Sequence, residues 1–144
     1  PNANAPNAAV TVTAYGVYVF RWTEMNGTCS GTARISVTFI QQPSADAGKG
    51  GNECDLNFVL NAVQGPGVGT WSKVSGPGNV TFTPNANAHN ATVTVTQFGA
   101  YDLAWTEVNS QCTSNDIIRV TFHDLPPVSA GSDAIICKGS NISS

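Results

Sequence analysis

Apolar and polar residues alternate with a period of two along most of this chain, and no stretch shows the spacing typical of helices. In segment 99–108, for example, Tyr101, Leu103 and Trp105 share one side of an extended chain. The same alternation, interrupted by turn residues, predicts strands within 54–62, 69–74, 80–82, 91–96, 99–108 and 117–122, with a short one near 44–48. About seven short strands of this kind predict an all-β fold, an antiparallel sandwich of two sheets.

The segment at residues 1–13 recurs in nearly the same form 83 positions later, at residues 84–96. When residues 1–61 are placed on residues 84–144 without a gap, 26 of the 61 pairs are identical, and the matches fall on the predicted strands. The triplet Trp-Thr-Glu, for instance, occurs at 22–24 and again at 105–107. Self-similarity at a fixed period is typical of repeat architectures, so the sequence predicts tandem sandwich units of about 83 residues.

Proline marks the expected boundaries between these units. Pro43 and Pro126 occupy the same place in the repeat, each shortly after a Val-Thr-Phe strand. Proline fits poorly in a central ladder and well in a short extended linker. We therefore expect one complete unit at 44–126, preceded by the C-terminal half of a unit at 1–43 and followed by the start of another at 127–144.

Charge and composition exclude several classes of partner. Only 10% of the residues are charged, the net charge is −3, and the six lysines and arginines are scattered. Nucleic acid and anionic membrane surfaces both require a cluster of basic residues, so neither is an expected partner. No stretch approaches the roughly 20 apolar residues of a spanning helix, so direct membrane insertion is not expected. Four cysteines in such a chain indicate disulfide bonds and an oxidising compartment.

The motifs of the chain resemble a known group of domains. The segments "GAYDLAWTEVN" at 99–109 and "WSKVSGPGNVTF" at 71–82, with the "AG…C" opening, resemble PKD-like, immunoglobulin-like tandem repeats of Bacteroidota surface adhesins. These are the gliding-motility adhesins of the SprB type, which use type IX secretion. The resemblance implies an immunoglobulin-like sandwich array at the cell surface, and it transfers no catalytic residue. One departure is Gly50, which stands where Asp133 fits the "AG-x-D" form of the opening.

The order Cys54, Trp71, Cys112 also resembles the immunoglobulin pattern, although Cys112 falls beyond its expected strand. That resemblance favours a disulfide between Cys54 and Cys112, with Cys29 and Cys137 paired outside these 144 residues. The alternative pairs Cys29 with Cys54 and Cys112 with Cys137, bridging neighbouring units.

The aromatic residues of the alternating rows are expected in the core. Trp22, Trp71 and Trp105 could stack on sugars if exposed, but core packing fits their rows better. Tyr18 and Tyr101 are predicted to be tyrosine-corner residues, whose hydroxyl bonds to the backbone upstream.

Polar residues give no catalytic constellation, so we expect no enzyme activity. Glu24 and Glu107 recur, but no second acid recurs in register, so each is expected to accept hydrogen bonds from loop amides or to pair with an arginine. His89 and His123 have no metal-ligand spacing and are expected at the surface. No cofactor is expected. A weaker possibility is structural calcium at the linkers, held by Asp46, Asn52, Asp124 and Asp133.

Three functions remain open from the sequence. The leading hypothesis is a structural segment of an extracellular stalk or filament, whose partners are neighbouring repeats of the same chain or identical chains. The second is an adhesive or carbohydrate-binding module that uses end loops at 65–69, 84–90 and 109–115 against a surface glycan or cell-surface ligand. The third is a self-polymerising subunit, in which residues 127–144 of one chain complete the half-unit 1–43 of the next.

Overall fold

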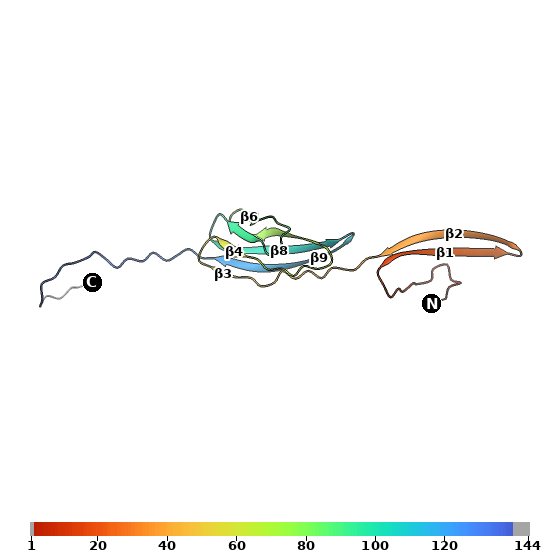
Figure 1. The fold of residues 1–144 in the computed structure, drawn as a ribbon, viewed down its shortest axis with the longest axis horizontal. Helices are drawn as coiled ribbons and strands as arrows, with labels where there is room; N and C mark the ends of the chain where they lie inside the picture. Colours follow the sequence, from red (N-terminus) through yellow and green to blue (C-terminus); the bar gives the residue numbers. More distant parts are fainter. Residues whose placement is uncertain (1, 140–144) are drawn as a thin grey trace.

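The computed structural model describes residues 2–139. Within this range the chain is all-β, and it has no helix long and apolar enough to cross a membrane. Pro1 and residues 140–144, which belong to the two predicted partial units, lie outside the described residues. The strands in chain order are β1 (Gly16–Asn26), β2 (Cys29–Phe39), β3 (Gly51–Glu53), β4 (Asn57–Val59), β5 (Val68–Ser75), β6 (Val80–Thr83), β7 (Thr92–Val95), β8 (Gly99–Asn109) and β9 (Cys112–Phe122) (Figure 1).

The strands from β3 to β9 form a two-layer sandwich (Figure 1). One sheet has the order β3-β9-β8-β5 and the other the order β4-β7-β6. Neighbouring strands are antiparallel, with the exception of β3, which runs parallel to β9. The predicted all-β, immunoglobulin-like sandwich class is therefore confirmed for this part of the chain.

The core lies between the two sheets and is built from the inward rows of both. The rings of Trp71 on β5 and Trp105 on β8 have centroids 5.2 Å apart, and Tyr101 meets Phe122 edge-on at 5.6 Å. Gly69 leaves room for this packing, because a Cβ at that position would collide with the Trp105 ring. The buried core residues are Ala47, Leu60, Ala62, Trp71, Ala91, Val93, Val95, Tyr101, Leu103, Trp105, Ile118, Val120 and Phe122.

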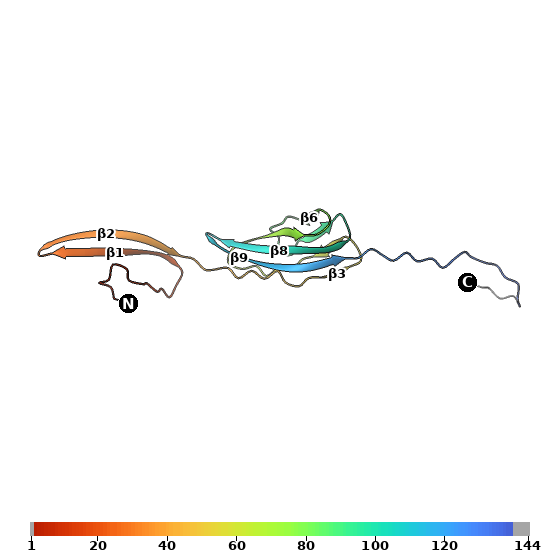
Figure 2. The ribbon, with the colours of Figure 1, turned by 180° about the vertical axis from the view of Figure 1, so that it is seen from behind.

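The hairpin β1–β2 lies outside the sandwich and repeats the geometry of β8–β9. Both hairpins have strands of 11 residues. In one the register runs from Gly16↔Phe39 to Asn26↔Cys29, and the other has the same register 83 positions on. Figures 1 and 2 show β1–β2 beyond one end of the sandwich, along the same long axis. The repeated sequence therefore adopts the same hairpin twice.

The structure shortens two of the predicted strands. Segment 54–62 contains only β4, because its first three residues form a bend and the chain beyond β4 bonds to the connection before β7. Segment 44–48 makes one isolated bridge, and regular pairing with β9 begins later, at β3. Gly50, directly before β3, lies so close to the backbone of Arg119 that a side chain would not fit.

Candidate functional site

The inner face of the β1–β2 hairpin carries an apolar surface that no second sheet covers. We call Phe20, Trp22, Ile35, Val37 and Phe39 the open face; they line a hollow of about 610 Å³ together with the N-terminal segment. Their counterparts 83 positions on are all buried core residues of the sandwich: Leu103, Trp105, Ile118, Val120 and Phe122. The hollow therefore lies over the face that the sheet β4-β7-β6 covers in the sandwich.

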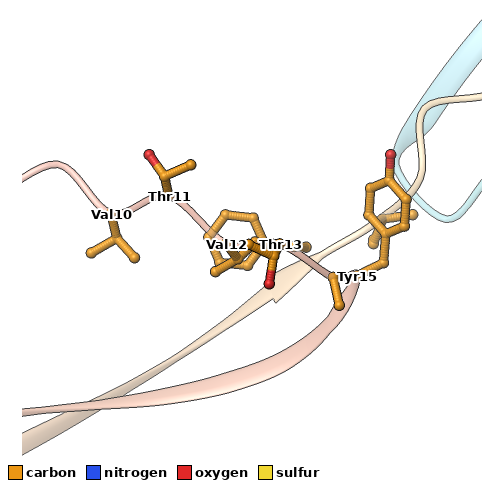
Figure 3. Close-up of a pocket in the computed structure, with 8 residues that line it drawn as sticks. Val10, Thr11, Val12, Thr13 and Tyr15 are labelled. Atoms are coloured by element: carbon orange, nitrogen blue, oxygen red, sulfur yellow. The ribbon is translucent and has the colours of Figure 1, made fainter.

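A second hollow, of about 410 Å³, lies beside the first and has the same origin. It is lined by residues 10–15 with Phe39 and Ile40, and Figure 3 shows this segment running beside the hairpin. The counterpart of its first residues is β7, which pairs with β4 on one side and β6 on the other. Residues 10–12 have the same Val-Thr-Val sequence but form no strand, because no partner strand lies beside them.

Three loops gather at the end of the sandwich that faces β1–β2. The segments 65–69, 84–90 and 109–115, in which the sequence suggested a ligand site, contain these loops together with the adjoining ends of β5, β8 and β9. Asn87 Nδ2 donates to Gly69 O at 2.8 Å, and Val68 in the same loop pairs with Val108 beside the hairpin tip.

The same end also holds the linker from the β1–β2 hairpin. Asn109 Nδ2 donates to Gln41 O at 2.9 Å, and Gln42 Nε2 donates to Thr113 O at 3.0 Å. Pro43 is buried. Part of the loop surface is therefore occupied by the neighbouring segment. These contacts were not predicted from the sequence, although the recurrence of Asn109 as Asn26 is a signal that pointed to this residue.

The recurring Trp-Thr-Glu motif holds a loop at this end. Glu107 is fully buried, and its Oε1 accepts hydrogen bonds from Gly65 N at 2.6 Å and from Trp105 Nε1 at 3.3 Å. The prediction of a carboxylate that accepts loop amide hydrogens is confirmed for Glu107. In the first copy Trp22 Nε1 donates to an exposed Glu24 at 2.9 Å, without a loop to hold.

Tyr101 and Tyr18 make the hydroxyl-to-backbone hydrogen bonds that a tyrosine corner requires. Tyr101 OH donates to Gln97 O and accepts from Gly78 N, both at 2.9 Å. Tyr18 OH donates to Ala14 O at the same distance. Trp71, Tyr101 and Trp105 are buried, whereas Tyr18 and Trp22 are half-buried on the hairpin.

One ion pair on the outer surface joins β8 to β9. Arg119 Nε donates to Asp102 Oδ1 at 2.8 Å, its Nη2 donates to Oδ2 at 3.0 Å, and Ser75 Oγ donates to Oδ2 at 2.9 Å. The hydrogen bond from Arg119, and then that from Ser75, lower the pKa of Asp102 from 3.8 to about 2. The hairpin β1–β2 has Val19 and Ser36 at the corresponding positions, so it has no equivalent ion pair.

Acid is expected to remove the contribution of Asp102 to stability. Because its pKa is lower in the folded chain, the carboxylate stabilises the fold above about pH 4, and this contribution is lost as the pH falls toward 2. We expect Asp102→Asn to lower the urea midpoint at pH 6, with a difference from the parent that shrinks steadily toward pH 2. A difference that stays constant over this range would contradict the assignment. The effect is expected to be small, because the Arg119 side chain is 68% exposed.

The structure places Cys54 and Cys112 at opposite ends of β9 and leaves all four cysteines free. Cys54 directly follows Glu53, which pairs with Phe122 at the end of β9, whereas Cys112 begins that strand. Ten residues of strand span about 33 Å, far beyond the roughly 7 Å between Cα atoms that a disulfide allows. The expected Cys54–Cys112 bond therefore does not fit this fold.

The alternative pairing does not fit either. Cys29 lies at the tip of β1–β2 that points away from the sandwich, far from Cys54 (Figure 1). Cys112 lies at the opposite end of the sandwich from the C-terminal tail that carries Cys137 (Figure 1).

The polar residues suggested for calcium do not converge. Among residues 2–139 there is no group of three or more histidine, cysteine or acidic side chains that could hold a metal ion. Asp46 Oδ1 accepts a hydrogen bond from the backbone two residues on, and Asn52 Oδ1 lies 3.0 Å from Nε2 of His123. Asp124 and Asp133 are exposed in the chain that leaves the sandwich.

His89 departs from the expected surface position. Its ring is half-buried, its Nδ1 atom is buried, and its carbonyl accepts a hydrogen bond from Trp71 Nε1 at 3.3 Å.

Comparison with known proteins places the fold. The solution structure of the PKD domain from the KIAA 1837 protein matches with a TM-score of 0.51 and 25% identity, over 63% of this chain and 96% of that domain. Titin Ig tandem domains A164-A165 match with a TM-score of 0.33 and 19% identity, over 77% of this chain and 63% of theirs. An endo-fucoidan hydrolase of glycoside hydrolase family 107 gives 0.34 and 12%, over 78% and 19%. No family model and no curated protein matches the chain.

The sandwich therefore has the fold of PKD and immunoglobulin-like domains. Nearly the whole of one PKD domain matches a stretch of this chain comparable in length with the predicted unit.

Proposed function

We propose that this chain is a structural segment of an extracellular repeat protein, a stalk or filament of a bacterial surface adhesin, and that it catalyses no reaction. Its partners are then neighbouring units of the same chain. The boundaries at residues 43 and 126 are part of this proposal, as are the bacterial source and the surface location suggested by the sequence resemblance.

One observation carries the proposal: the open face of β1–β2 consists of residues whose counterparts form a closed core in the sandwich. A half-core of this kind requires the front strands of a unit that precedes it. The chain then builds sandwiches one after another rather than a single globule.

The path of the chain through the sandwich supports an extended array. The linker at residues 41–43 arrives at the end that carries the β8–β9 tip, and the chain leaves from the opposite end, after Phe122 (Figure 1). Units that receive the chain at one end and release it at the other stack end to end. Strands of 11 residues span about 36 Å, so each unit adds about 40 Å with its linker.

The length of tandem copies tests this function. Proteins of two, three and four copies of residues 44–126, joined without added residues, are expected to gain about 40 Å in maximum dimension per copy by small-angle X-ray scattering. A maximum dimension that rises by less than half of this would show that the units fold back on one another, and the stalk proposal would be abandoned.

A second candidate, an adhesive or carbohydrate-binding module, is favoured by one observation: the three end loops do lie together. Because the linker covers part of their surface, we rank this function lower. Glycan-array binding by the isolated unit 44–126 that disappears when residues 41–43 are included would support it, and no binding in either form would count against it.

A further inference from the structure

We propose that a disulfide bond joins Cys54 of one unit to Cys112 of the unit that follows it, across the linker. This inference rests on the proposed tandem array. This pairing differs from both pairings that the sequence suggested.

Cys54 lies at the end of its unit from which the chain leaves. His123 N donates to Glu53 O at 2.7 Å, which places Cys54 beside His123, one residue past the end of β9. The counterpart of His123 in the preceding unit is Ile40. In a completed preceding unit, the equivalent of Cys54 therefore lies beside Ile40, at the start of the linker.

Cys112 lies at the end of its unit that receives the chain. The linker runs beside the first residues of β9: Gln42 Nε2 donates to Thr113 O at 3.0 Å, and Ala45 N donates to Ser114 Oγ at 3.1 Å. Continued in this register, Cys112 falls beside Pro43, at the end of the linker. The two cysteines of a junction therefore lie at the two ends of the same short stretch of linker.

The separation along the linker sets how far the two units must move. Between the level of Ile40 and that of Pro43 the extended chain rises about 10 Å, against a Cα separation of about 4.4–6.8 Å in disulfides. Cys54 begins a bend, and Cys112 lies next to a hairpin turn, so neither is fixed within a ladder on both sides. The bond therefore requires the two units to tilt so that their cysteine Cα atoms come at least about 3 Å closer than the straight linker places them.

Geometry also accounts for the four free thiols. Cys29 and Cys112 each lie at the tip of a hairpin, the end of the unit that receives the chain. Cys54 lies at the end from which the chain leaves, and Cys137 is its counterpart in the repeat. Each junction needs one cysteine of each kind from consecutive units in the order Cys54 then Cys112. No two of these four cysteines meet that condition. Cys54 would need the tip cysteine of the unit after its own, and Cys112 would need the counterpart of Cys54 in the unit before its own; neither is among residues 1–144.

The bond forms by thiol–disulfide exchange. Cys54 and Cys112 are accessible to an oxidant, being exposed and half-buried respectively. A small-molecule or protein disulfide is the oxidant: one thiolate attacks it and releases one thiol, and the second thiolate then displaces the other thiol. One S–S bond is formed and one is reduced, and the protein loses two hydrogen atoms.

The test adds the missing front half to the full chain. Residues 44–83 are joined directly in front of residue 1, so that Thr83 precedes the repeated Pro-Asn-Ala-Asn phrase as it does in the complete unit. In this extended chain, Cys29, the original Cys54 and Cys137 are replaced by serine, which leaves Cys54 of the added segment and Cys112. With oxidised glutathione as the oxidant, we expect nearly all molecules to lose two hydrogen atoms by intact mass and to bind no thiol reagent.

A matched variant separates this bond from one within a unit. It keeps Cys54 of the added segment and Cys29, with Cys112 replaced by serine, so that both thiols belong to the same unit. We expect both to stay free to thiol reagents. A bond in this variant, or two free thiols in the first, would overturn the proposal.

A protein of two joined copies and a scattering measurement distinguish failure of the disulfide from failure of the stalk. If the extended chain shows no folded first unit by backbone hydrogen exchange, two joined copies of residues 44–126 carry the same test. There Cys54 of the first copy and Cys112 of the second are retained. Scattering of the reduced protein reports on the array alone: an extended shape without a bond refutes the disulfide and keeps the stalk, and a collapsed shape refutes the stalk.

Discussion

Adding residues 44–83 in front of residue 1 is expected to turn the β1–β2 hairpin into a second complete sandwich. The added strands would cover the open face, whose counterparts in the complete unit are all buried. We expect backbone amides of β1 and β2 to become protected from hydrogen exchange on the order of a hundredfold, equivalent to about 3 kcal/mol of opening free energy. Amides of β8 and β9, already covered, should change little.

Trp71→Ala in the added segment gives the matched control. Its counterpart in the sandwich packs on Trp105 at 5.2 Å, so the new Trp71 should pack on Trp22. We expect this variant to lose most of the gained protection, while an added segment of scrambled sequence gains none. Equal protection with the native and the scrambled segment would contradict the assignment of 1–43 as a half-unit.

Trp105→Ala is expected to cost about 3–5 kcal/mol of unfolding free energy, whereas Trp22→Ala should cost less than about 0.5 kcal/mol. The two residues occupy the same position of the same motif. Trp105 is 1% exposed and packs on Trp71, but Trp22 is half-buried on a face without a second sheet. Guanidinium unfolding followed by circular dichroism measures both.

A conservative replacement checks the reason for this difference. Trp105→Phe keeps an aromatic ring but loses the indole N–H that donates to Glu107, and it should fall between the parent and the alanine variant. In the extended chain the cost of Trp22→Ala should rise toward that of Trp105→Ala. If the two substitutions cost the same in the present chain, the open face is not exposed in solution.

The alternation of apolar residues was sufficient to predict the fold class, because the face on which a side chain lies is set by its position within its own strand. Leu103 and Trp105 face inward as their spacing requires. The same reasoning fails for residues 10–12, which repeat the Val-Thr-Val of β7 and yet form no strand. Whether such a segment pairs depends on β4 and β6, and local sequence contains no information about partners that are missing.

The candidate site shows the same division. The role of Glu107 was predictable, because a carboxylate that recurs at a strand end without a second acid has few other uses. The cysteine pairing was not predictable, because the order of Cys54, Trp71 and Cys112 does not tell at which end of a strand each one lies. The parallel pairing of β3 with β9 decides that, and a three-residue strand gives little signal in the sequence.

That parallel pairing has a mechanical consequence. Tension on a stalk would pull the arriving segment toward one end of the sandwich and the end of β9 toward the other. Because the two run in the same direction, the pull slides them past each other, and their contacts, from Ala45 to Glu53, bear the load together. An antiparallel pair held at adjacent ends would instead open one bond at a time. Under such tension these contacts are therefore loaded in shear rather than peeled apart one by one.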